Sequence, residues 1–330
     1  MVNYFKQLKF VFPTGLLLFF FSCATIPVHP PVQYLSAYIV NDDQTFLSRY
    51  LPVFVIENDK EKYNRIGTPT AKIATDGKEH IYVDPEKATV YTQIRKFETS
   101  KSTYTNLVYR IHFEKIPGGF FPFYLGKGKN IGLIVIVTLN RQNDPILYTL
   151  VHTCGCYLAF VPTSYLPVDS FPDGWEKDRQ SVYFESLPGF LDVNESSLPS
   201  NKMFILIRDG SHRVKDIWLS SSNSLKNHTI VKAELQPLIS LEKLALKDHE
   251  TTSFYETAGL RKGYVKGAHK CRERLLMSWW ALDWRIGEDK IFGKDKNHGI
   301  VFYTSLKPWD KEASDMRDFT AFLKYWKWNL

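Results

Sequence analysis

The sequence predicts an α+β fold, with a mainly antiparallel β-sheet in the N-terminal two thirds of the chain and helices segregated in the C-terminal third. Up to about residue 220, runs of β-branched and aromatic residues are separated by Gly, Pro, Asn or Asp, which is typical of short strands. Beyond that point, apolar residues recur at helical spacing. The composition, 44% hydrophobic and 15% aromatic over 330 residues, supplies a large core and excludes a disordered chain.

The strand signal is strongest in six segments, at residues 51–57, 80–83, 89–97, 107–114, 131–139 and 146–161. The sequence NRQNDP at 140–145 is expected to join the last two segments as a hairpin loop. Asp209-Gly210, a dipeptide favoured in tight turns, is expected to join two further strands. Residues 162–199, rich in Pro, Ser, Asp and Gly, are expected to form a long and partly irregular excursion. The β-rich part should therefore extend over residues 35–220.

Three helices are expected in the remaining part, residues 221–330, which should pack on the β-rich part as one compact unit. The first follows Pro237, the second covers residues 270–285, and the third covers 314–326 with Ser314 as its cap. One face of the second helix collects large apolar side chains, namely Leu276, Trp279, Trp280 and Trp284. Because aromatic stripes at helical spacing usually face a core, we expect the second and third helices to pack through theirs.

The first 22 residues have the three parts of a secretory signal. Lys6 and Lys9 give a basic start without any acid, residues 15–21 (GLLLFFF) are apolar, and Ser22 is a small residue at the end. A helix that spans a bilayer needs about 20 apolar residues, and this run is shorter. We therefore expect residues 1–22 to be a signal peptide rather than a permanent membrane span.

Residues 20–23 (FFSC) resemble the lipobox of bacterial lipoprotein signals, in which a small residue precedes a cysteine that receives diacylglycerol. The resemblance covers residues 1–24 and departs from the usual pattern at Phe20, where leucine is common. It implies a lipid on Cys23, and Ala24 in place of Asp implies an outer-membrane address. The proline-rich residues 23–34 then form a stiff spacer between the lipid and the folded part.

Composition and motifs narrow the function classes. The formal net charge is +7, but the basic residues are scattered among acids, so we expect no nucleic-acid partner. Walker A, Rossmann, HExxH and GxSxG patterns are absent from the sequence. The expected partner is the membrane, reached through the N-terminal lipid, and the sequence identifies no protein partner. The leading interpretation is a lipid-anchored protein of the cell envelope, more in keeping with a non-catalytic role than with an enzyme.

One cluster of residues could carry chemistry, the VHTCGCY sequence at 151–157. In an extended strand, His152, Cys154 and Cys156 would share one face, with neighbours about 6.6 Å apart. Gly155 would let the backbone bend and bring the two sulfurs closer still. An imidazole and two thiolates suit zinc or copper, and Cys271 or His269 could supply a fourth ligand. The sequence therefore offers a candidate metal site. A metal- or thiol-dependent oxidoreductase of the envelope is the alternative function.

Three other interpretations fit the same spacing. Cys271 could form a structural disulfide with Cys154 or Cys156 in an oxidising compartment. Alternatively, Cys154 and Cys156 could form a strained and easily reduced disulfide. Both could also be plain buried thiols beside a hydrogen-bonded histidine, which would leave a structural or partner-binding lipoprotein without small-molecule chemistry.

A second alternating set consists of Arg110, His112 and Glu114, which we expect to face solvent or a cleft because the residues between them are apolar. A histidine between a base and an acid could act as a general acid–base, although an exposed strip of ion pairs is the simpler interpretation. Three acidic residues, Asp283, Glu288 and Asp289, follow the tryptophan-rich helix. They could form a cation site, or they could be a solvated helix end.

Overall fold

The computed structural model describes residues 35–40, 45–118, 126–193, 201–246, 249–297 and 299–330. The predicted signal peptide, the lipid site at Cys23 and the proline-rich spacer lie outside the described residues. Within the described ranges, no helix is both long and apolar enough to cross a membrane.

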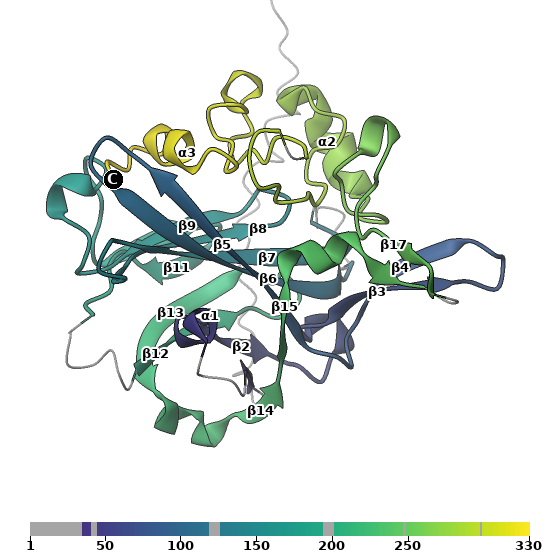
Figure 1. The fold of residues 1–330 in the computed structure, drawn as a ribbon, viewed down its shortest axis with the longest axis horizontal. Coiled ribbons are helices and arrows are strands. Elements are labelled where there is room, and N and C mark those ends of the chain that lie inside the picture. The colour runs from purple at the N-terminus through teal and green to yellow at the C-terminus, as the bar shows by residue number, and fades with distance from the viewer. Residues whose placement is uncertain (1–34, 41–44, 119–125, 194–200, 247–248, 298) are drawn as a thin grey trace, which may run out of the picture. The chain divides into compact units, whose positions relative to one another are not determined.

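A six-stranded sheet forms the middle layer of the molecule (Figure 1). Its strand order is β15-β5-β6-β7-β8-β9, and the five strands from β5 to β9 form a continuous antiparallel meander. The predicted hairpin loop does join β7 to β8, so that part of the prediction is confirmed. The strands of this central sheet are β5 (Thr89–Glu98), β6 (Thr103–Ile116), β7 (Gly128–Leu139), β8 (Pro145–His152), β9 (Leu158–Pro162) and β15 (Glu234–Pro237).

A five-stranded sheet of order β13-β12-β2-β1-β14 packs on one face of the central sheet. The predicted turn at Asp209-Gly210 joins β12 to β13, where Arg208 N donates to Arg213 O at 2.9 Å. Its strands are β1 (Leu35–Ile39), β2 (Val53–Glu57), β12 (Asn201–Ile207), β13 (Val214–Ser221) and β14 (Thr229–Lys232). The remaining elements of this part are α1 (Phe46–Arg49), the pair β3 (Thr68–Ile73) and β4 (Glu79–Asp84), and the hairpin β10 (Arg179–Val182) and β11 (Glu185–Pro188).

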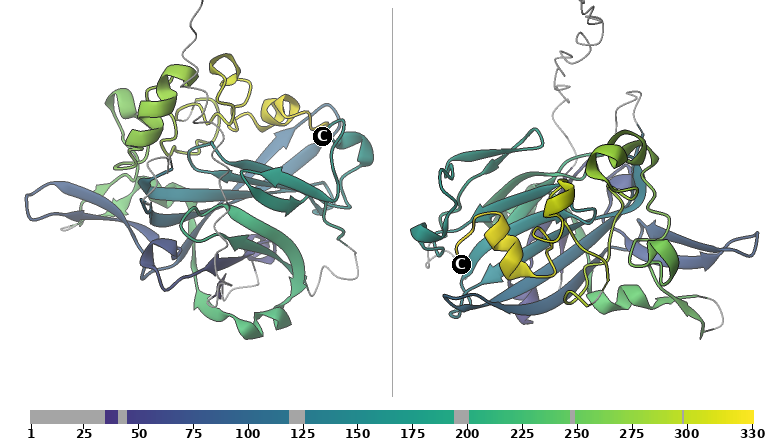
Figure 2. Two further views of the ribbon diagram at one scale, coloured as in Figure 1. Left: turned by 180° about the vertical axis from the view of Figure 1, so that it is seen from behind. Right: turned by 90° about the horizontal axis from the view of Figure 1, so that it is seen from above.

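Residues 238–330 cover the opposite face of the central sheet, as Figures 1 and 2 show. Alternate residues of β6 therefore enter two different cores. Tyr109 and Ile111 pack between the two sheets, whereas Val108 packs under the C-terminal segment. The predicted α+β fold is confirmed, with a mainly antiparallel β part and with the two longer α-helices, α2 and α3, in the C-terminal region.

The C-terminal part departs from the prediction in detail. β14 and β15 return the chain to both sheets, so it leaves the β layers only after Pro237. The expected first helix is instead a 3₁₀ turn, η5 (Leu238–Glu242), followed by β16 (Leu244–Ala245), which pairs with β17 (Thr251–Thr252).

The third helix, α3 (Phe319–Tyr325), begins five residues later than predicted and is capped by Asp318, whose side chain accepts from Ala321 N. Ser314 is not its cap, because its hydroxyl oxygen accepts from Thr304 N and Ser305 N in a buried loop. The apolar stripe of α3 is buried as predicted, with Phe319, Phe322 and Leu323 in the second core.

The second helix, α2 (Cys271–Ala281), forms within the predicted range, but the prediction for its aromatic stripe is wrong. Trp279, Trp280 and Trp284 are 72%, 52% and 65% exposed. The side chains that α2 buries are instead those of Glu273 and Ala281. Its packed face is therefore small and partly charged, and its apolar face is turned to solvent.

Candidate functional site

The two cysteines of the CGC sequence lie on a turn rather than on a strand. β8 ends at His152, and Gly155, with φ +85°, closes the turn by donating its N–H to His152 O at 2.7 Å. The strand that the sequence predicts here is therefore wrong, whereas the expected bend at Gly155 does bring the two cysteines together. Cys156 N donates to Cys154 Sγ at 3.4 Å, and the two thiols hydrogen-bond to each other.

The backbone of Gly155 also meets the C-terminal segment. A Cβ atom at this position would lie 2.1 Å from Tyr303 O, far inside van der Waals contact. Only glycine combines the left-handed conformation with such a close approach of another backbone. The CGC turn is thus held between the sheet and the segment that contains Tyr303.

A cavity of about 370 Å³ opens at this turn, and we refer to it as the thiol pocket. It has the size of a small-molecule site. β8 and the CGC turn contribute His152, Cys154 and Cys156 to its lining. The start of α2 and the β10–β11 hairpin contribute its other walls, among them Lys270, Glu273, Met277, Tyr183 and Phe184.

A buried charge network lies against the thiols. The Lys270 side chain is 4% exposed, and its Nζ lies 3.6 Å from Asp289 Oδ2 and 3.9 Å from Glu273 Oε2. Thr153 donates its hydroxyl to Asp289 Oδ1, and Lys290 Nζ donates to Cys154 O at 2.6 Å. Buried charges persist only when they are paired, so this network fixes the start of α2 against the CGC turn.

These contacts shift the pKa values of the two thiols in opposite directions. The hydrogen bond from the Cys156 thiol, aided by the Lys270 ammonium and by His152, holds the pKa of Cys154 well below its ordinary value. The same hydrogen bond, together with burial, raises the pKa of Cys156 well above its ordinary value. His152 Nε2 donates to His212 O at 2.9 Å, so Nδ1 is the ring nitrogen available to the Cys154 thiol. The arrangement therefore favours the thiolate at Cys154 and the thiol at Cys156.

Glu273 is the titratable carboxyl of the pocket. Burial, together with the negative charges of Cys154 and Asp289, raises its pKa to about 7, against the opposing effect of Lys270 and Lys290. Its proton can therefore be taken up or released near neutral pH.

This pKa predicts a pH dependence of stability. Between pH about 4.5 and about 7 the folded protein retains the Glu273 proton that the unfolded chain releases, so the free energy of unfolding falls as pH rises. The loss over that window should be about 3 kcal/mol, and Glu273→Gln should remove it. Denaturant unfolding of both proteins across the window measures the difference. Parallel pH profiles for the wild type and the variant would contradict the assignment.

The rim of the pocket contains a strained hairpin turn. Tyr183 and Phe184 connect β10 to β11 and both have positive φ, at 50° and 71°, a geometry in which Asn-Gly is preferred. Tyr183 donates its hydroxyl to Cys156 O, whereas Phe184 is 83% exposed. Bulky residues in this conformation are costly, and they are found where function maintains them.

Phe184→Gly should therefore raise the free energy of unfolding by about 1 kcal/mol while removing part of the rim. We expect slower reaction of Cys154 with bulky aromatic disulfides in this variant, and no gain of stability in the matched variant Phe184→Ala, which keeps the strained φ. Denaturant unfolding and stopped-flow thiol kinetics check the two effects. A Phe184→Gly protein less stable than Phe184→Ala would show that the turn is not strained.

The predicted zinc or copper site does not assemble. Within the described ranges, no three His, Cys, Asp or Glu side chains come together in a way that could hold a metal ion. Cys271 is exposed and lies outside the pocket lining, and His269 Nδ1 accepts from Arg261 Nη1 at 3.3 Å. The Lys270 ammonium stands among the thiols and carboxylates, where a cation would be repelled. The residues present do not fit a metal.

The predicted disulfides are not formed in this structure either. Cys154, Cys156 and Cys271 are all free thiols. Cys154 is buried, Cys156 is half-buried and Cys271 is exposed at the first position of α2.

The strip of Arg110, His112 and Glu114 is also not the solvent-facing set that the sequence predicts. Arg110 and His112 are fully buried, because the C-terminal segment covers that face of β6. Arg110 Nε donates to His112 Nε2 at 2.9 Å and His112 Nδ1 donates to Ile131 O at 3.3 Å, so both ring nitrogens of this buried side chain are engaged within the protein. Burial also lowers the pKa of His112 well below its ordinary value. Only Glu114 is partly exposed, and it pairs with Lys115 at 3.3 Å.

The three acids after α2 do not form a cation site. Glu288 binds the guanidinium groups of Arg261 and Arg274, and Asp283 pairs with Lys311 at 3.3 Å. Asp289 belongs to the charge network beneath the thiols.

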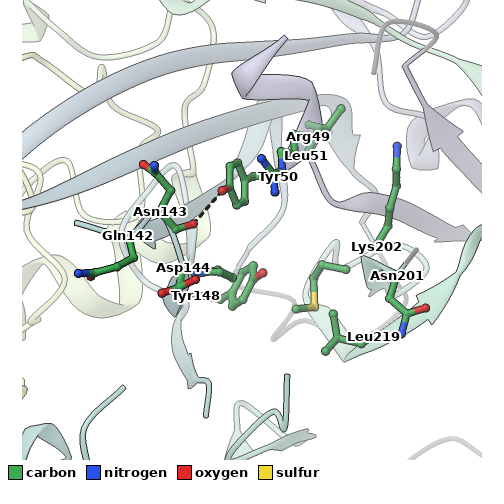
Figure 3. A pocket seen from close by; sticks show the side chains of 12 residues that line it. Arg49, Tyr50, Leu51, Gln142, Asn143, Asp144, Tyr148, Asn201, Lys202 and Leu219 are labelled. Atoms are coloured by element: carbon green, nitrogen blue, oxygen red, sulfur yellow. Dashed lines mark hydrogen bonds between the residues drawn. The ribbon is translucent and has the colours of Figure 1, made fainter. Parts of the chain in front are cut away.

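A second and smaller hollow, of about 160 Å³, lies between α1, the β7–β8 loop and the start of β12 (Figure 3). Tyr50 and Asn143 are neighbours in its lining, and the Tyr50 hydroxyl donates to Asn143 O at 2.7 Å. Its lining contains neither cysteine nor histidine, so the thiol pocket is the stronger candidate for chemistry.

Sequence reasoning grouped His152, Cys154 and Cys156 correctly but missed Lys270 and Glu273, which complete the pocket from α2. The nearest signal in the sequence is the position of Lys270 beside Cys271, but an ammonium group cannot bind a metal and so does not belong to a set of metal ligands. Comparisons of the chain with family models, with curated proteins and with solved structures give no match.

Proposed function

We propose that this protein is a thiol–disulfide oxidoreductase in which Cys154 attacks and Cys156 resolves. One observation carries the proposal: Cys154 Sγ accepts the N–H of Cys156 and lies beside its thiol, in a pocket walled by Lys270. Thiolates, rather than thiols, attack disulfides, and a backbone N–H and a neighbouring ammonium both favour the thiolate.

In the first step, the Cys154 thiolate attacks one sulfur of a substrate disulfide, R–S–S–R′. The substrate S–S bond breaks, a mixed disulfide forms between Cys154 and R–S, and R′–S⁻ leaves and takes a proton from water. The Lys270 ammonium, close to both sulfurs, offsets the negative charge that is shared among the three sulfur atoms in the transition state.

In the second step, Cys156 resolves the mixed disulfide. Its thiol transfers a proton to the Glu273 carboxylate, and its sulfur attacks Cys154 Sγ, which releases R–S⁻ and leaves a Cys154–Cys156 disulfide. The two cysteines lose two electrons and the substrate disulfide gains them. Glu273 suits the proton acceptor because its pKa of about 7 leaves it partly ionised at neutral pH.

The N-terminal expectations belong to the same proposal. A lipid on Cys23 would hold the oxidoreductase at the cell envelope, on the outer membrane, where disulfides persist as substrates. Intact mass of the native protein tests this part separately, since a mature protein that does not begin at an acylated Cys23 would refute it.

The redox activity is tested by mixing the reduced full chain with glutathione disulfide and then alkylating the free thiols. We expect a product that has lost two hydrogens, in which Cys154 and Cys156 resist alkylation and Cys271 is still labelled. Unchanged mass and full labelling of all three cysteines would instead support the non-catalytic lipoprotein that the sequence favours.

A further inference from the structure

The exposed face of α2 is the least expected surface of this protein. Six large apolar side chains project from it and from the residues that follow it, and we call them the α2 surface: Leu275, Leu276, Trp279, Trp280, Leu282 and Trp284. The indole N–H of Trp279 donates to Leu276 O at 2.9 Å, so the ring needs no further hydrogen-bond partner. Contiguous apolar patches of this kind on a folded protein mark sites of interaction.

The charges around the α2 surface are sorted by sign. The two acids of this segment face inward, where Glu273 lines the thiol pocket and Asp283 pairs with Lys311 and accepts from the Tyr303 hydroxyl. The basic residues Arg272 and Arg285 are only partly buried. The surface therefore presents apolar rings with a positive border.

Two neighbouring turns extend the same surface. The turn η7 (Gly259–Arg261) carries Leu260 and is tied to α2 because Arg261 and Arg274 both bind Glu288. Leu260 is exposed, and exposed Lys262 follows it.

At the other end of α2, the turn η8 (Pro308–Asp310) carries the exposed Trp309 and is tied to α2 through the Lys311–Asp283 pair. Lys307, 62% exposed, precedes it and pairs with Asp310 at 3.9 Å. Figure 1 shows α2 on the outer side of the C-terminal segment, away from both large sheets. η7 thus adds an apolar side chain and an exposed cation, whereas η8 adds an exposed ring beside an ion pair.

We propose that the α2 surface binds the headgroup region of an anionic lipid bilayer. Tryptophan is enriched where headgroups meet acyl chains, because its ring is apolar and its N–H is polar. A helix with Trp and Leu on one side and basic residues at its borders is typical of segments that lie in the membrane interface. Lysine and arginine beside such a face are attracted to anionic lipids. Pairing with a second copy would instead bring two positive borders together.

The proposed contact has a consequence for the thiol pocket. α2 contributes Glu273 and Met277 to the pocket, while the exposed Leu275 and Trp279 lie on its opposite side. A bilayer held against the α2 surface would therefore keep the pocket close to the membrane, whether or not the pocket carries out disulfide exchange. The membrane contact stands on its own residues and does not depend on the redox proposal.

The test uses tryptophan fluorescence of the full chain reconstituted into vesicles of brominated phosphatidylcholine, with and without phosphatidylglycerol. Bromine quenches only rings that enter the bilayer, so we expect quenching that increases with phosphatidylglycerol and falls with salt. The variant Trp279→Phe/Trp280→Phe/Trp284→Phe should lose most of the quenchable emission. Trp218→Phe, which removes a ring on β13 far from α2, should keep it.

Two outcomes would overturn the proposal. Equal quenchable fractions in the wild type and the triple variant would show that the α2 surface stays out of the bilayer, even when the N-terminal lipid holds the chain on the vesicle. A blue shift that grows with protein concentration in lipid-free solution, without any quenching by bromolipid, would assign the surface to a second copy of the chain.

Discussion

Replacing Gly155 with alanine is expected to lower the free energy of unfolding by about 3 kcal/mol and to disorganise the thiol pocket. Two effects add in this variant. Alanine at φ +85° costs about 1 kcal/mol, and its Cβ would lie 2.1 Å from Tyr303 O, which forces one of the two backbones to move. Movement of either backbone separates the CGC turn from the C-terminal segment. Denaturant unfolding measures the first effect, and the rate of Cys154 alkylation measures the second.

Gly77→Ala is the matched control. Gly77 has φ +77°, and a Cβ at that position would meet no atom within 4 Å. It therefore reports the conformational cost alone, about 1 kcal/mol, and should leave the thiol kinetics unchanged. If both variants lost the same stability, the contact with Tyr303 could not be what holds the turn.

The strands of the central sheet were predictable because β-branched and aromatic runs, bounded by turn residues, leave the backbone few alternatives. What lies on each face was less predictable. Arg110 and His112 alternate with apolar residues and therefore indicate an exposed face, yet a segment more than a hundred residues later in the sequence covers them. Periodicity reports which side chains share a face, not what packs against that face.

The same limit explains the tryptophans of α2. Their spacing correctly placed them on one side of a helix, but the core contact of that helix is made by Glu273 and Ala281. The Glu273 carboxyl on the packed face is accommodated because Lys270 Nζ lies within 3.9 Å and because burial raises its pKa to about 7. The i, i+3 spacing of the two residues is visible in the local sequence, but their burial follows from tertiary structure.

Part of the candidate site was predicted from the sequence, but on a structural argument that the fold does not bear out. His152, Cys154 and Cys156 do share one pocket, but a glycine turn, rather than strand alternation, brings them together. The sequence therefore identified the reactive residues but did not indicate which reaction their surroundings favour. Metal binding required a further cysteine or histidine, whereas α2 supplies an ammonium and a carboxyl group.

Cys154→Ser is expected to slow the reaction of the protein with disulfides by about 100-fold or more at neutral pH, because a hydroxyl cannot replace a thiolate as the nucleophile. Cys156→Ser should behave differently. Cys154 still attacks in that variant, but the mixed disulfide with the substrate persists, since no second thiol resolves it. Intact mass after exposure to glutathione disulfide separates these outcomes. Cys154 should carry an added glutathione in the Cys156→Ser variant and none in the wild type.

The pH profile identifies the attacking group. Because the pKa of Cys154 is held well below that of an ordinary thiol, its alkylation rate should change little between about pH 7 and about pH 9, where an ordinary cysteine accelerates steeply. The hydrogen bond from Cys156 remains in Lys270→Met, so this variant should restore part of that rise by removing the ammonium that also favours the thiolate. Cys271→Ser, which alters an exposed thiol outside the pocket, should leave the profile unchanged. A steep rise already present in the wild type would mean that the Lys270 ammonium and the N–H of Cys156 do not stabilise a thiolate at Cys154, and the order of attack and resolution would have no basis.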